Sequence, residues 1–207
     1  MALVKYNNNS ISAVTAAAAI PSGAMTLIKT LTASSSATLS FVHGTSDVVL
    51  DSTYPIYVFK FYNIHPSNTS DPEFQVNFRD GSTAYDAIKT TTFFYTYHGE
   101  DGSSGELSYA AAADLAQSTE PQRIASDVQG DNDSSTSGTL YLYNPSSTTF
   151  VKHFMSTSSV SHGQPAAFSA YVAGYCNVTA AIDGVQFSFS AGNIDSGVIK
   201  LFGIKDS

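Results

Sequence analysis

Residues 184–207 read GVQFSFSAGNIDSGVIKLFGIKDS, and their pattern of apolar positions predicts the fold class. In the first part of this stretch, apolar and polar residues alternate, with Val185, Phe187 and Phe189 on one side of an extended chain. Strict alternation is typical of a β-strand that buries one face and leaves the other in water. The stretch therefore predicts an antiparallel β-sheet with one face on a core.

The last strand of this stretch, VIKLFGI, is apolar on both faces. Val198, Phe202 and Ile204 lie on one face, and Ile199 and Leu201 lie on the other. One face belongs to the core of the chain, and the second face needs another cover. We expect this cover to be a neighbouring subunit, so that one of the two sets lies at an oligomer interface. The pattern does not decide which set it is.

Strand patterns continue back along the chain to residue 25. Most are rich in aromatic and β-branched residues, which favour strands, and Gly, Ser, Asn or Asp separates them. With the two strands above they number about ten: MTLIKTL, ATLSFVH, TYPIYVFKFYNIH, EFQVNFR, IKTTTFFYTYH, TLYLYN, TFVKHFM and FSAYVAGYC. Turns at this spacing predict a single all-β domain, an antiparallel β-sandwich.

Two segments depart from the strand pattern. Residues 106–117, ELSYAAAADLAQ, are rich in Ala and Leu, and Ser103 or Ser104 could cap their start, so we expect one short helix there. Residues 1–23 have no steady period and end in the turn residues Pro-Ser-Gly. They predict an N-terminal arm, which leaves residues 24–207 for the sandwich.

Composition and charge exclude several classes of partner. The net charge is −8, and the nine basic residues are scattered singly, so no basic stripe is present for nucleic acid. No stretch approaches the length of a membrane span, which indicates no membrane insertion. The single cysteine, Cys176, lies in an apolar run and cannot form a disulfide within the chain. We expect a buried, unreactive thiol.

No motif indicates catalysis. The five histidines form no HxxxH, HxH or HExxH pattern, so metal-ligand spacing is absent. There is no GxSxG sequence to mark a nucleophilic serine, and the four glutamates give no evident catalytic pair. We therefore expect a protein without catalytic residues and without a cofactor.

One acidic loop is a weak candidate for a cation site. In DVQGDNDSS, Asp131 and Asp133 occupy alternate positions and Asp127 lies nearby, so their oxygens could hold a calcium ion. The alternative is an exposed loop in which Asp and Asn side chains bond to their own backbone. We prefer the alternative and expect no metal.

Several sequence segments resemble those of a family of virion proteins of tailed bacteriophages, many of them marine. The likeness runs from about residue 25 to the C-terminus, and the final strand after a Ser-Gly turn is also similar in style to the trimeric jelly rolls of the tumour-necrosis-factor and C1q type. The segments are IYVFKFYNIHPSN, TTTFFYTYH, DLAQST, GDND, TSGTLYLYNPSSTTFVKHF and QFSFSAGNIDSGVIKLFGI.

These resemblances imply a jelly-roll-like homotrimer that is a non-enzymatic structural protein of the virion. We expect a capsid decoration or cement protein on the capsid exterior, attached through the N-terminal arm to other virion proteins, above all the major capsid protein. The alternative is a tail fibre or receptor-binding tip that recognises a host surface glycan through loops 99–106 and 127–138.

Overall fold

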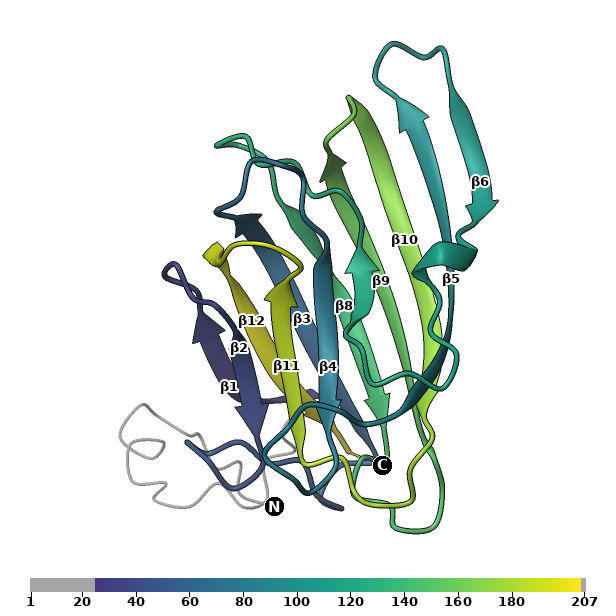
Figure 1. Ribbon diagram of the computed structural model, residues 1–207. Helices are drawn as coiled ribbons and strands as arrows, with labels where there is room; N and C mark the ends of the chain where they lie inside the picture. Colours follow the sequence, from purple (N-terminus) through teal and green to yellow (C-terminus); the bar gives the residue numbers. More distant parts are fainter. Residues whose placement is uncertain (1–24, 206–207) are drawn as a thin grey trace, which may run out of the picture.

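Two antiparallel β-sheets packed face to face make up the computed structural model, which describes residues 25–205 (Figure 1). The predicted all-β sandwich is confirmed. The predicted arm, residues 1–23, lies outside the described residues. No helix in the described part is long and apolar enough to cross a membrane.

The larger sheet has eight strands and the smaller sheet four. In spatial order the large sheet consists of β1 (Met25–Thr32), β12 (Ile194–Ile204), β3 (Ile56–Pro66), β8 (Thr136–Tyr143), β9 (Lys152–His162), β10 (Ala166–Cys176), β5 (Lys89–Gly99) and β6 (Gly105–Tyr109). The small sheet consists of β2 (Leu39–Val42), β11 (Gly184–Phe189), β4 (Phe74–Arg79) and β7 (Gln122–Ala125).

The chain crosses repeatedly between the two sheets. Strands β2, β4, β7 and β11 lie in the small sheet, and the strands between them lie in the large sheet. This order is jelly-roll-like, with the β8–β9 hairpin inserted into the large sheet and β1 and β12 added at one side. Long crossings bring the last two strands between partners from early in the chain, so the C-terminal residues lie within both sheets.

The prediction of one short helix over residues 106–117 is wrong. Residues 105–109 form β6, which pairs with β5, and only a single 3-10 turn (Ala111–Ala113) follows. The described residues form twelve strands, two more than the predicted ten, because the sequence pattern does not reveal β6 and the four-residue β7. Alanine-rich composition favours a helix only weakly, and pairing with a neighbouring strand outweighs it here.

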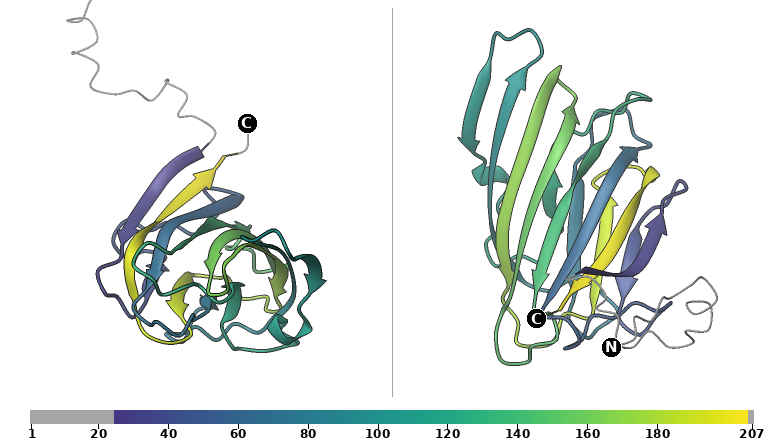
Figure 2. Two further views of the ribbon diagram at one scale, coloured as in Figure 1. Left: turned by 90° about the horizontal axis from the view of Figure 1, so that it is seen from above. Right: turned by 180° about the vertical axis from the view of Figure 1, so that it is seen from behind.

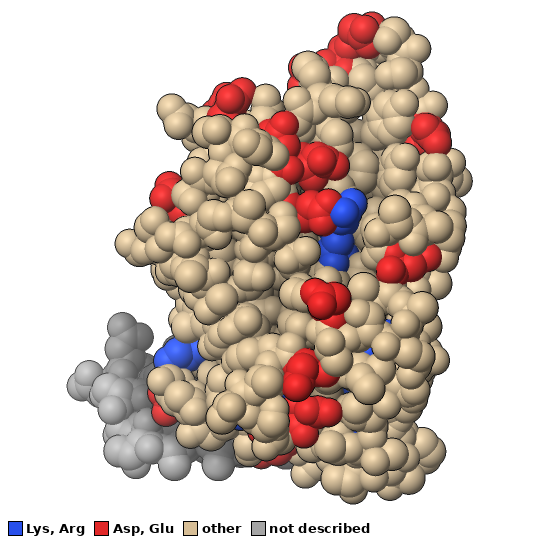
Figure 3. Space-filling model, in the orientation of Figure 1, with Lys and Arg blue, Asp and Glu red and all other residues tan. Residues whose placement is uncertain are grey.

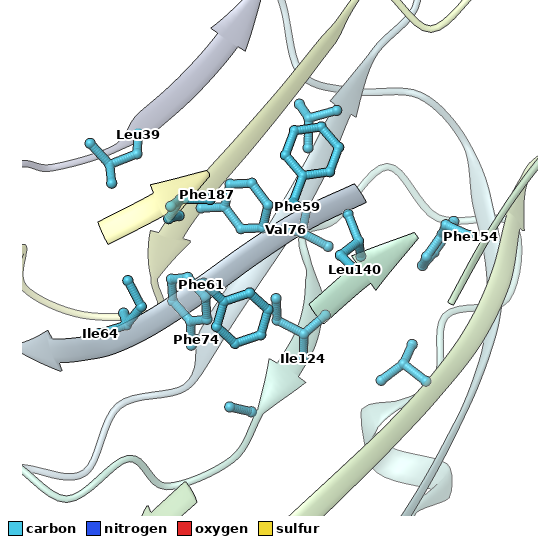
Figure 4. Packing of buried hydrophobic residues seen from close by; sticks show 14 of the residues in the cluster. Leu39, Phe59, Phe61, Ile64, Phe74, Val76, Ile124, Leu140, Phe154 and Phe187 are labelled. Carbon is cyan, nitrogen blue, oxygen red and sulfur yellow. The ribbon is translucent and has the colours of Figure 1, made fainter. Parts of the chain in front are cut away.

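The core is a layer of phenylalanine rings between the two sheets (Figure 4). Phe187 of β11 lies at its centre, with its ring centroid 5.6 Å from that of Phe59 and 5.8 Å from that of Phe74. Phe41 completes the cluster with an edge-to-face contact to Phe59 at 5.3 Å. All four side chains are buried, and each contributes roughly 1.5–3 kcal/mol by leaving water.

At one end of the sandwich, two buried lysines flank the single cysteine. Cys176 pairs in register with Lys89 on one side and Lys152 on the other. Lys89 Nζ donates to Asn77 Oδ1 at 2.6 Å, and Lys152 Nζ donates to the Val178 carbonyl at 2.7 Å. Burial lowers the pKa of Lys89 to about 8 and raises the pKa of the Cys176 thiol to about 12. The expected burial of the thiol is confirmed, and a raised pKa disfavours the nucleophilic thiolate form.

Candidate functional site

The outer face of the large sheet is the candidate functional site. This face is formed by the side chains of the eight strands that point away from the small sheet, and we call it the outer face. The view from behind shows the sheet open on this side, with no segment of the described chain packed over it (Figure 2). The small sheet covers only the opposite side.

Large apolar side chains gather on the outer face. Among the described residues ten such side chains are exposed, and eight of them lie here: Met25, Leu27, Tyr62, Phe94, Leu107, Tyr109, Tyr141 and Met155. Scattered apolar residues are normal on a protein surface, but a contiguous patch marks an interaction site. The concentration of these side chains on one face therefore indicates a contact surface.

The strand register joins part of this patch into a continuous row. Leu27 of β1 is opposite Phe202, which is opposite Val58 of β3. Val58 is opposite Tyr141 of β8, and Tyr141 is opposite Met155 of β9. Directly opposed side chains on one face of a sheet lie within contact distance of each other. Val58 is fully buried, so the exposed part of this apolar row comes from the other four strands.

Negative charge is almost absent from the large sheet. Its eight strands contain only two of the chain's 17 acidic residues. Glu106 lines a cleft on the inner side of the sheet, and Asp195 lies at the irregular start of β12. On the outer face, Lys60 Nζ lies 5.9 Å from the centroid of the Phe202 ring, and Lys200 Nζ lies 5.6 Å from that of Tyr62. The outer face therefore carries almost no negative charge and is weakly positive.

The structure separates the two candidate interface sets on the last strand. Val198, Phe202 and Ile204 belong to the outer face and are partly exposed. Ile199 and Leu201 are fully buried against the small sheet, in the core of the chain. The prediction that Ile199 and Leu201 could form the interface is therefore wrong, because these side chains cannot reach another chain.

The acidic loop does not bring its three candidate ligands together. Asp127 Oδ2 lies 3.5 Å from His162 Nε2, and a hydrogen bond from His162 holds the pKa of Asp127 below its usual value. Asp131 Oδ2 accepts a hydrogen bond from Gln129 Nε2 at 2.8 Å. Within residues 25–205, no three His, Cys, Asp or Glu side chains, Asp133 included, group so as to hold a metal ion.

A second feature, which the sequence did not reveal, is a cleft of about 400 Å³ on the inner side of the large sheet. It lies beside β7, where β5 and β6 extend past the small sheet, and its wall includes Tyr95, Tyr97 and Phe168. These residues come from two strands that are far apart in the sequence.

No protein-family model, no curated protein and no solved structure matches the chain.

Proposed function

We propose that the chain is a non-enzymatic structural subunit of a bacteriophage particle that assembles as a homotrimer through its outer face. The observation that carries the proposal is the apolar row across five strands of a sheet that is nearly free of carboxylates. The resemblance of the chain to virion proteins of tailed phages supports the location. The similarity of its last strand to trimeric jelly rolls supports the number of subunits.

The distribution of charge favours a second copy of the chain as the occupant of the outer face. At a net charge of −8, two copies repel each other wherever their acidic surfaces meet. Acidic side chains are spread over the side of the small sheet, as the space-filling view shows (Figure 3). The outer face is where copies can approach with few carboxylates between them.

The size of the outer face is also sufficient for a stable assembly. Five of its eight strands are eleven residues long. At about 3.3 Å per residue and about 4.8 Å between strands, the face covers roughly 1,200 Å², whereas a stable interface needs about 800 Å² from each partner. Charged groups are scarce there, so little desolvation opposes the burial of this area.

Within the particle, we assign the protein to capsid decoration, with residues 1–23 as the attachment to the major capsid protein. Deleting residues 1–20 removes no residue of the described strands, since β1 begins at Met25. The truncated protein should therefore remain a folded trimer of unchanged melting temperature. It should no longer bind capsids that lack the protein, as measured by co-sedimentation. An unfolded product, or undiminished binding, would refute this role for the arm.

Copy number separates this location from the tail. A decoration protein is present in numbers comparable to those of the major capsid protein, whereas a tail fibre or receptor-binding tip is present in only a few copies. Quantitative mass spectrometry of purified particles, with the major capsid protein as the internal standard, measures this ratio. A ratio far below that of a decoration protein would contradict the capsid location and favour a place in the tail.

A further inference from the structure

The cleft exists because the two sheets differ in width. β7 is the last strand of the small sheet, and it packs over β9 and β10, where Ser158 Oγ donates to the Ile124 carbonyl at 2.7 Å. Beyond β7 the large sheet continues with β5 and β6, and its inner side is left open (Figure 1). The cleft therefore has a rigid floor of paired strands, as a preformed binding site requires.

One wall of the cleft is aromatic. The ring centroids of Tyr95 and Phe168 are 4.9 Å apart with nearly parallel planes, and Tyr97 continues the series at 6.3 Å from Tyr95. His162 packs on the other side of Phe168 at 5.0 Å. Tyr95 and Tyr97 remain partly exposed to the cleft. Tyrosine offers both an apolar surface and a hydroxyl, which suits a ligand with alternating C–H and O–H groups.

Hydrogen-bonding groups of both kinds face this wall. Glu106 and Asp127 supply carboxylate oxygens as acceptors, while Arg123 and Gln164 can donate. Arg123 forms an ion pair with Glu73, so its positive charge is already compensated. Asp127 is likewise paired with His162, so an anionic ligand would meet the carboxylate of Glu106 without a free cation among the lining residues to attract it. The cleft therefore favours an uncharged ligand rich in hydroxyl groups.

The cleft continues into a second hollow. The neighbouring hollow, of about 500 Å³, is lined by residues 99–104 at the β5–β6 turn and shares Tyr97, Gln164 and Ala166 with the first. The two hollows together, which we call the trough, enclose more volume than one sugar ring fills. We infer that this trough binds a neutral oligosaccharide, with sugar rings against the tyrosines and hydroxyls bonded to Glu106 and Asp127. The inference does not depend on the oligomeric state proposed above.

Titration of the full-length protein with cellohexaose, mannohexaose, xylohexaose and laminarihexaose tests the inference, with binding followed by NMR chemical shifts. At least one of these probes should bind with a dissociation constant of about 1 mM or lower. Tyr97→Ala should weaken that binding about tenfold or more, and so should Glu106→Gln, an exposed and conservative change that leaves packing intact. Thr96→Ala is the matched control, because Thr96 lies between the two tyrosines and points to the outer face.

Three outcomes would overturn the inference. The first is that none of the four hexasaccharides binds at concentrations up to about 10 mM. The second is that binding occurs but is equally strong in Tyr97→Ala, Glu106→Gln and Thr96→Ala. The third is that choline binds in the trough more tightly than every one of the four hexasaccharides, since aromatic rings and carboxylates also suit an organic cation.

Discussion

Replacing Met155 with aspartate should convert the proposed trimer into a monomer. Met155 lies in the apolar row beside Tyr141, and its side chain is 51% exposed in the single chain. A carboxylate at this position is solvated in the monomer, so folding is little affected. In the assembled face it would be buried without a partner, which costs several kcal/mol per subunit. Size-exclusion chromatography with light scattering should show the mass of one chain.

Phe150→Asp is the control for this variant. Phe150 is 70% exposed, and it lies in the loop between β8 and β9 rather than on the sheet. The same loss of apolar surface and the same added charge should therefore leave the trimer intact. Phe202→Asp should weaken assembly less than Met155→Asp, because Lys60 lies close enough to pair with the new carboxylate. Equal behaviour of Met155→Asp and Phe150→Asp would contradict the assignment of the interface.

The second large effect concerns the core. Phe187→Ala should lower the free energy of unfolding by about 3–5 kcal/mol, because it empties a site surrounded by the rings of Phe41, Phe59 and Phe74. For a chain of this size the melting temperature should fall by roughly 10 °C. Urea titration followed by circular dichroism measures the free energy.

Ser188→Ala, one position further along β11, is the matched control. Ser188 points away from the core and is partly exposed, so its replacement should change the free energy of unfolding by less than about 0.5 kcal/mol. A similar loss of stability in both variants would mean that β11 does not present Phe187 to the core in this register.

Alternation made most of the sandwich predictable from the sequence. In β4 and β11 the apolar positions recur at every second residue, and the register of these strands places Phe74 opposite Phe189 and Val76 opposite Phe187. In β12 both faces are apolar, so the pattern indicated that both faces are covered. It did not indicate which face packs against the core of the chain and which is left for another chain. Only the packing of Ile199 against the small sheet decides that question.

Other features depend on contacts between distant segments. Strand β6 forms because β5 offers a free edge, and the alanine and leucine content of residues 106–117 gives no sign of this. The cleft joins Tyr97 of β5 and Phe168 of β10 with Asp127, which follows β7. None of these residues stands out in its own segment. Their proximity follows from the strand order and from the narrower second sheet, neither of which can be deduced from local pattern.

The mass of the purified full-length protein in solution tests the central claim most directly. Light scattering at micromolar concentration should give three times the chain mass of 21.9 kDa, and this mass should persist on dilution. The area of the outer face and its near-absence of carboxylates are the reasons to expect association, and the similarity of the last strand to trimeric jelly rolls is the reason to expect three chains. A stable monomer of 21.9 kDa at the same concentration would contradict it.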